Sequence, residues 1–164
     1  MDNQSFDFKN HLSRSLIILW WFKDFKIVSV KAISENEMDV FFNPRFRFLY
    51  YLLGLKYKRG FPISGYSSFR LVFIASIIGA GYTLKKAEKD GEVIVRDFHI
   101  EYQDPIMFHY NTLIKVKVKT TILKETDNYH KYVTEFSIGD NAEHSGTTKL
   151  YYCKPNLKKF SYLK

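Results

Sequence analysis

The chain has 164 residues, the size of one domain, and its 15 Phe, 12 Tyr and 2 Trp can build a sizeable core, which excludes low-complexity disorder. The net charge of +8 admits an anionic partner, such as nucleic acid, a membrane surface or a phosphate-bearing cofactor. The single cysteine, Cys153, excludes an intrachain disulfide or a cysteine-based zinc cluster and fits a reducing compartment. No apolar run approaches the roughly 20 residues that cross a membrane. These properties predict one soluble, cytoplasmic domain.

The first part of the chain predicts a helix and two strands. Residues 11–25 are rich in Leu, Ile and Trp, and we expect an N-terminal helix that packs on the domain or lies on a membrane surface. Residues 27–33 and 38–42 predict short strands, joined by a polar turn. We expect Pro44 to end this pattern, because proline cannot continue a central strand.

An inserted segment of aromatic and basic character follows, at about 44–64. Residues 45–58 could form a helix that begins just after the proline, whereas the glycines, proline and serines of 59–68 predict a loop. The basic residues of 45–59 could bind coenzyme A phosphates, anionic lipid or nucleic acid, although no nucleic-acid-binding module is recognisable and nucleic acid is not favoured. A solvated, partly docked helix is the plainer interpretation.

The most informative stretch is a helix that is apolar on nearly every side. From Phe69 onward, apolar residues recur at helical spacing, and the faces between them are apolar too. The rest of the domain must enclose such a helix on most sides. Gly79 and Gly81 each cost about 1 kcal/mol relative to alanine, which is tolerable where another backbone packs closely. Charged residues at 85–90 return the chain to solvent, so we predict this central helix at 67–86.

The remainder of the chain predicts an antiparallel sheet. Four strands are expected, at 93–102, 112–123, 129–138 and 147–154. In the second of these, apolar residues alternate with lysines, which indicates one dry and one wet face. A sheet of this kind can bury its dry face by curling around the apolar helix. The predicted class is therefore α+β, a hot-dog fold in which residues 1–164 form a single domain.

One stretch, 65–105, resembles the thioesterase-like hot-dog domain found attached to some bacterial acetyltransferases. Members of that family carry an Asn, a Gly-Thr-x-Phe-Gly-Gly-Ser segment, an apolar helix ending in Gly-Trp-Gly, and a strand ending in Tyr-x-x-Pro. Here the helix reads FIASIIGAG, with Gly79 and Gly81 at the matching positions and Ala80 in place of Trp. In the strand VIVRDFHIEYQDPI the matching residues are Asp97, Ile100, Tyr102 and Pro105.

The resemblance implies an acyl-thioester hydrolase or a relative that only binds acyl groups. Related enzymes polarise the thioester carbonyl with a backbone N–H at the helix start, where the helix dipole helps to hold an oxyanion. The corresponding residues here are Tyr66, Ser67, Ser68 and Phe69, with Asn43 in place of the family's Asn. Ser68 and Phe69 replace the family's Gly-Gly, and Ser67 or Ser68 could instead simply cap the helix.

Related enzymes also use an acidic residue about two turns into the helix to orient water. Ser76 occupies that position, and a serine is not a general base unaided. No Asp or Glu occurs within 65–82, so a carboxylate would have to come from elsewhere. Asp97, His99 and Glu101 alternate on one face of their strand like an acid–base group. The plainer interpretation places these three on the wet face of the sheet.

The other histidines, His11, His109, His130 and His144, are dispersed and are expected in turns or on the surface. They lack metal-ligand spacing, and neither a metal nor a cofactor is predicted. The candidate catalytic residues are therefore Ser68, Ser76 and Asp97. The candidate substrate-binding residues are Asn43, Tyr66, Ser67, Phe69, His99 and Glu101.

The expected partners are an acyl-CoA or acyl-carrier substrate and a second copy of the chain. A homodimer or a dimer of dimers is predicted because an uncovered sheet edge needs covering, and strand 112–123 has no proline to blunt it. Two alternatives to a hydrolase stay open. One is a non-catalytic acyl- or lipid-binding hot-dog protein, and the other is a basic binder of membrane surfaces or nucleic acid.

Overall fold

The computed structural model describes residues 25–44, 61–85, 92–108 and 113–153, which form two sheets and one helix. The large sheet contains β1 (Phe25–Ala32), β2 (Glu37–Pro44), β4 (Glu92–Tyr102), β6 (Ile114–Glu125), β7 (Tyr129–Ile138) and β8 (His144–Cys153). The helix is α4 (Gly65–Thr83), and β3 (Phe61–Pro62) pairs with β5 (Met107–Phe108) in the small sheet. Within these residues no helix is long and apolar enough to span a membrane.

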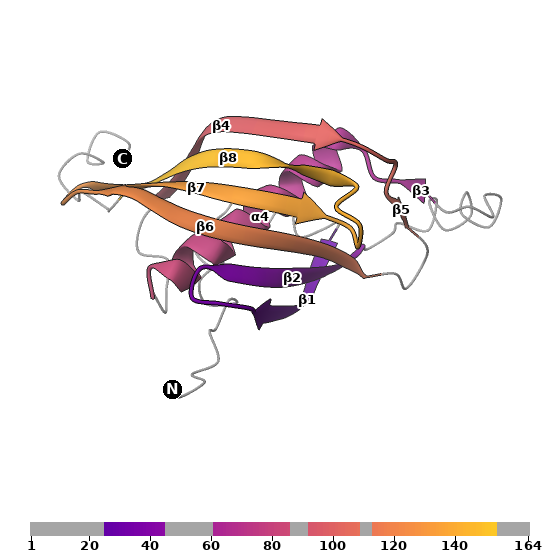
Figure 1. The fold of residues 1–164 in the computed structure, drawn as a ribbon, viewed down its shortest axis with the longest axis horizontal. Coiled ribbons are helices and arrows are strands. Elements are labelled where there is room, and N and C mark those ends of the chain that lie inside the picture. Colours follow the sequence, from indigo (N-terminus) through magenta and orange to yellow (C-terminus); the bar gives the residue numbers. More distant parts are fainter. Residues whose placement is uncertain (1–24, 45–60, 86–91, 109–112, 154–164) are drawn as a thin grey trace, which may run out of the picture.

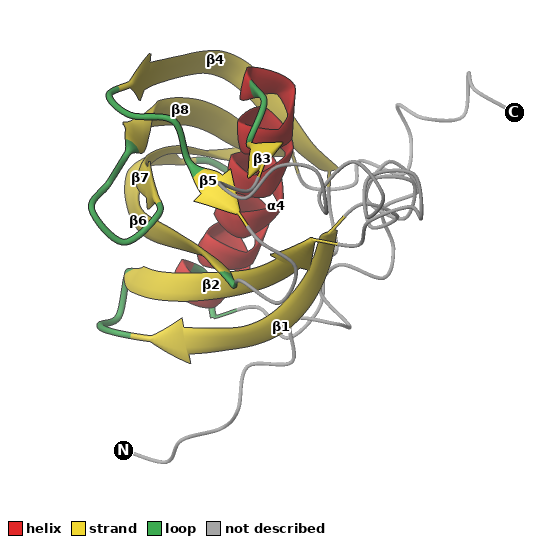
Figure 2. Ribbon diagram, turned by 90° about the vertical axis from the view of Figure 1, so that its right-hand side faces the viewer, coloured by secondary structure: helices red, strands yellow, loops and turns green. Residues whose placement is uncertain are grey.

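All neighbouring strands of the large sheet run antiparallel, in the order β1-β2-β6-β7-β8-β4 (Figure 1). The first strand after the helix, β4, therefore lies at the edge of the sheet, beside the last strand β8. Figure 2 shows the sheet curling around α4, with the helix on its concave side. A curved antiparallel sheet wrapped around one central helix is the hot-dog fold, and the predicted fold class is confirmed.

Strand β6 shows why the sheet has a dry side and a wet side. Ile114, Val116 and Val118 are buried, and Thr120 continues the buried row. The lysines between them lie on the other face, where Lys117 forms an ion pair with a glutamate of β2. The alternation predicted from the sequence is confirmed, because successive side chains of a strand point to opposite faces.

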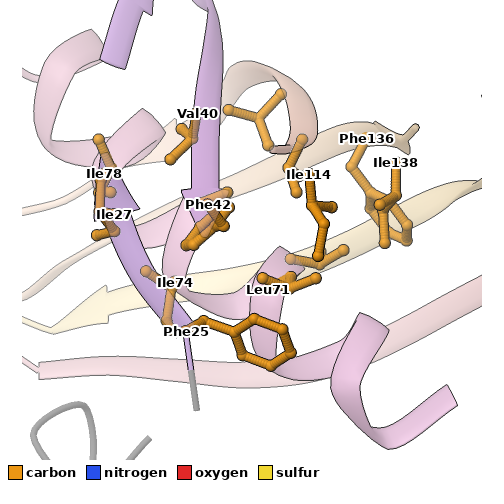
Figure 3. Close-up of a cluster of buried hydrophobic side chains, with 14 of the residues drawn as sticks. Phe25, Ile27, Val40, Phe42, Leu71, Ile74, Ile78, Ile114, Phe136 and Ile138 are labelled. Atoms are coloured by element: carbon orange, nitrogen blue, oxygen red, sulfur yellow. The ribbon is translucent and has the colours of Figure 1, made fainter. Parts of the chain in front are cut away.

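The core lies between α4 and the concave face of the sheet, and 12 of the 19 helix residues are buried. Figure 3 shows part of this cluster, with helix, β1, β2, β6 and β7 side chains in contact. Its labelled residues are Phe25, Ile27, Val40, Phe42, Leu71, Ile74, Ile78, Ile114, Phe136 and Ile138. Full burial of one large apolar side chain contributes about 1.5–3 kcal/mol, so this cluster is the main source of stability.

The helix approaches the sheet closely at Gly79. A Cβ atom at this position would lie 2.8 Å from Oγ1 of Thr120 and 3.3 Å from Cγ2 of Val118, both on β6. A larger residue would push the helix away from the sheet, which offsets the poor helix propensity of glycine. The expected close approach exists here, with β6 side chains rather than a backbone as the neighbours.

Two boundaries around the helix differ from the predicted ones. The helix spans Gly65–Thr83 instead of 67–86, because Ser64 caps it two residues earlier than expected. The predicted loop at 59–68 also contains β3, whose pairing partner lies more than 40 residues further along the chain. A two-residue strand has too little periodicity to be recognised from sequence.

The N-terminal predictions are only partly covered by the described residues. Phe25, predicted as the end of the helix at 11–25, is the first residue of β1, and the rest of that predicted helix lies outside the described residues. Pro44 does not end the strand early, because it is the last residue of β2 and lies opposite Phe25. The predicted helix at 45–58 also lies outside the described residues.

The predicted uncovered edge is wrong. Strand 112–123 corresponds to β6, which lies inside the sheet between β2 and β7. The edges of the large sheet are β1 and β4. A lack of proline is expected in an interior strand, because proline cannot donate to the hydrogen-bond ladder on either side.

Candidate active site at the start of the central helix

The first turn of α4 is organised by Ser64, not by Ser67 or Ser68 as the sequence suggested. The Ser67 N–H donates to Oγ of Ser64 over 3.2 Å, and the Ser68 N–H donates to the Ser64 carbonyl over 3.0 Å. The N–H groups of Gly65 and Tyr66 precede any helical acceptor. N–H groups at the start of a helix form the positive end of its dipole and can stabilise a polarised carbonyl oxygen.

A buried serine–histidine pair lies beside this helix start. Oγ of Ser68 is 2.9 Å from Nδ1 of His144, and the two residues are 0% and 2% exposed. His144 is the first residue of β8, 76 positions further along the chain. The expectation that His144 lies in a surface turn is therefore wrong, since the strand predicted at 147–154 begins three residues earlier.

The histidine of this pair is held neutral. Burial lowers the pKa of His144 below its usual value of 6.5, while a hydrogen bond with the Asp104 backbone and the nearby Glu143 carboxylate oppose that shift. A neutral imidazole has one donor and one acceptor nitrogen. In the tautomer protonated at Nε2, Nδ1 of His144 accepts a hydrogen bond from the Ser68 hydroxyl.

Tyr102 covers the pair from the outside. It is the last residue of β4 and lies opposite His144 in the β4–β8 register. Its ring meets the imidazole edge-on, with 4.7 Å between the two ring centroids. The side chain is 53% exposed. A Cβ atom at Gly65 would lie 2.5 Å from the Tyr102 hydroxyl oxygen, so only glycine at this position lets the tyrosine rest against the helix start.

Ser76, the candidate for the position of the catalytic acid, lies in the core. It is fully buried, and its hydroxyl has no hydrogen-bond partner within the described part of the chain. It precedes Gly79 by three residues and so shares the helix face that meets β6. The structure does not bring this serine to the Ser68–His144 pair, because the two lie on different turns and Ser76 faces the sheet.

Asp97, His99 and Glu101 lie on the outer face of β4, away from the helix. The Asp97 carboxylate accepts a hydrogen bond from Lys149 over 2.9 Å, and this contact lowers its pKa. His99 and Glu101 contact each other at 3.3 Å, and their side chains are about two-thirds exposed. The geometry of the three residues matches the wet face of a sheet, and the structure keeps them apart from the buried serine.

The other candidate residues are divided between the helix start and β2. Tyr66 is exposed, Ser67 is hydrogen-bonded to the cap, and Phe69 is half-buried with its ring edge-on to Phe98 at 4.8 Å. Asn43 is half-buried near the end of β2, opposite a lysine of β1. Three of these residues therefore lie at the start of α4, and Asn43 lies on β2.

Two residues of this region escaped sequence analysis. One is His144, which could have been found by extending the β8 alternation backwards, since Thr148, Leu150 and Tyr152 are buried in the same parity. The other is Arg70, a buried cation whose guanidinium lies 5.5 Å from the Tyr66 ring centroid, within cation–π range. Arg70 places a positive charge one turn into the helix. Within the described residues no three His, Cys, Asp or Glu side chains could hold a metal ion.

Comparison with known proteins supports the fold. No family model matches the sequence, and no curated protein matches it. Among solved structures, a candidate thioesterase from Shewanella oneidensis is similar with a TM-score of 0.51 and 16% identity, over 85% of this chain and 90% of that one. The candidate thioesterase yhdA from Lactococcus lactis has a TM-score of 0.50 and 12% identity, over 87% and 99%. The chain therefore shares the hot-dog fold with these two proteins.

The burial of Ser76 generates a testable prediction. We expect Ser76→Asp to destabilise the protein by about 3 kcal/mol or more, roughly 6–12 °C in melting temperature, because the carboxylate would be buried without a partner. Ser67→Asp is the matched control, since its acid would sit in the partly exposed first turn, where negative charge is favourable. Thermal melts followed by circular dichroism provide the measurement. Equal melting temperatures for wild type and Ser76→Asp would contradict the placement of Ser76 in the core.

The lowered pKa of His144 predicts a pH-dependent stability. Because the unfolded histidine binds a proton more readily than the folded one, its contribution is complete above about pH 6.5 and falls as pH drops towards the lowered folded pKa. We expect the melting temperature to fall more between about pH 7.5 and pH 5 in wild type than in His144→Asn, which does not titrate. Parallel losses in the two proteins would show that His144 does not carry this effect.

Proposed function

We propose that this protein hydrolyses acyl thioesters of coenzyme A or an acyl carrier at the start of α4. The observation that supports this is the buried Ser68–His144 pair beside the first helical turn. The N–H groups of Gly65 and Tyr66 would polarise the thioester carbonyl, and preorganised donors of this kind are a large part of acyl-transfer catalysis. Neither Ser76 nor Asp97 would take part in this reaction.

The chain carries positive charges that suit an anionic carrier. Arg70 lies one turn into α4, and in the sequence the aromatic and basic segment 45–59 comes between β2 and β3. Positive side chains would bind the phosphates of coenzyme A or of a phosphopantetheine arm. A cytoplasmic location remains a prediction.

A second candidate function is acyl or lipid binding without catalysis. Helix α4 lacks an acidic side chain, and the residue at the position of the related enzymes' acid is buried in the core. General acid–base assistance contributes about 10²–10⁴-fold, so a site that lacks it would bind substrate and turn it over slowly. This second function predicts saturable binding of acyl-CoA with no release of thiol.

A hydrolysis assay distinguishes the two functions. We expect slow release of free coenzyme A from butyryl-, octanoyl- or palmitoyl-coenzyme A, measured with a thiol reagent alongside calorimetric binding. Gly65→Ala is the informative variant, because the added methyl group would push the Tyr102 side chain off the helix start and open the pair. Thiol release that rises in this variant supports hydrolysis at the helix start. Binding without release favours the second function, and the absence of both overturns the proposal.

We also propose a homodimer, now through β4 rather than β6. Strand β4 is an eleven-residue edge strand without proline, and Ile94 on it is 53% exposed. We expect light scattering at micromolar concentration to give twice the 19.5 kDa chain mass, and Ile94→Lys to weaken the association. Leu123→Lys is the control, because Leu123 is equally exposed but lies on an interior strand. A strict monomer in wild type would rule the dimer out.

A further inference from the structure

The Ser68–His144 pair has the geometry of an activated nucleophile. The 2.9 Å between Oγ and Nδ1 is a hydrogen-bond distance, and a hydroxyl within reach of an imidazole is the arrangement on which serine nucleophiles depend. The Ser68 hydroxyl would have a hydrogen-bond partner even without the histidine. The Ser68 hydroxyl already lies 3.3 Å from the Ser64 carbonyl, one turn back in the helix, which is a common partner for helical serines.

We propose that Ser68 is the nucleophile and His144 the general base of this protein, so that thioesters are cleaved through an acyl-serine intermediate. The proposal rests on the proposed thioesterase function and names the residues that would carry it out. It replaces the carboxylate-oriented water of related enzymes with a pair of residues that the fold brings together from α4 and β8.

The reaction has two balanced halves. Oγ of Ser68 bonds to the thioester carbonyl carbon while its proton passes to Nδ1 of His144. The C–S bond then breaks, His144 gives this proton to the leaving sulfur, and a thiol departs. Water then adds to the acyl-serine carbonyl and gives a proton to His144. The C–O bond to Ser68 breaks, the serine recovers its proton, and a free carboxylic acid leaves. The N–H groups of Gly65 and Tyr66 are the donors available to the oxyanion in both halves.

The histidine is prepared for this role by its surroundings. Its ring is neutral near pH 7 and so is able to accept a proton. The hydrogen bond with the Asp104 backbone fixes the ring, as an orienting group does in other nucleophile–base pairs. The ring contacts Ser68 and Tyr102, and the Glu143 carboxylate, which accepts a hydrogen bond from the Asn141 N–H in the preceding turn, adds a negative charge that favours the imidazolium formed during the reaction.

Tyr102 controls access to the pair. Ser68 and His144 are closed to solvent, whereas Tyr102 is half exposed and rests on both the imidazole and the helix start. Movement of this one side chain would open the pair to an acyl group from outside. The closed arrangement also keeps water from the serine until substrate displaces the ring.

An alkyl fluorophosphonate tests the nucleophile directly, because such probes phosphonylate activated serines and lose fluoride. We expect one probe molecule per chain, placed on Ser68 by peptide mass spectrometry. His144→Asn should lower the labelling rate by about 10²–10⁴-fold, the contribution of a general base. Tyr102→Ala should raise the rate several-fold by removing the cover. Ser68→Ala should abolish labelling, whereas Ser145→Ala, the serine next to His144 in β8, should leave it unchanged.

The possible outcomes separate this proposal from the proposed function. A labelled Ser68 with no release of thiol from acyl-coenzyme A would sustain the nucleophile and overturn the thioesterase function. Thiol release by a folded Ser68→Ala variant would overturn the nucleophile and leave the thioesterase function standing. Thiol release by wild type would do the same if neither wild type nor Tyr102→Ala becomes labelled. Circular dichroism of each variant establishes folding, and the wild-type adduct needs no variant at all.

Discussion

The enclosure of α4 is the constraint on which the rest of the structure depends. A helix with apolar residues on every side gains most by losing contact with water all round, and a single flat sheet could cover only one side of it. The sheet therefore curls until β2, β6 and β7 contact the helix, with β1 and β4 at the two edges (Figure 2). The dry face of each strand follows from this geometry, and so does the wet outer face that carries the lysines.

The same enclosure decides where chemistry is possible. Most of α4 is surrounded by apolar side chains, so the helix can meet a ligand only near its start, where its N–H groups have no helical acceptors. Polar residues of the wet face lie on the side of the sheet away from the helix, where Asp97, for example, pairs with Lys149. Asp97 is thereby kept on the face of the sheet that does not meet the helix.

The two buried serines of α4 differ in whether their hydroxyl groups have hydrogen-bond partners. Ser68 is bonded to His144 and lies near a helix carbonyl, so its burial is compensated. The Ser76 hydroxyl has no partner among the described residues, and an unsatisfied buried group of this kind costs about 1–3 kcal/mol. Close contact at Gly79 one turn later leaves little space for anything larger at this helix face. Serine at position 76 is thus better explained by its small size than by its hydroxyl.

Sequence periodicity predicted the fold because each long element repeats its own pattern. The alternation in β6 and the unbroken apolar character of α4 are local signals, and together they imply a curled sheet. The short pairing of β3 with β5 carries no periodicity and was missed. His144 was missed for a different reason. Its strand begins directly after the turn at Gly139, and its contact with Ser68 spans 76 positions, a distance over which one sequence gives no pairing information.

The position of Tyr102 has a consequence for how easily the site opens. Among the described strands β4 pairs only with β8, and Tyr102 is its last residue, opposite the first residue of β8. Strand ends at a sheet edge open locally at a far lower free energy than the whole domain unfolds. Fraying at this end would have to break the hydrogen bonds from the Gln103 and Asp104 N–H groups to the Glu143 carbonyl, which lie directly beyond the pair, and would then lift Tyr102 without disturbing the core around α4. The backbone hydrogen bonds at this end of β4 would thereby set how often the buried pair is exposed.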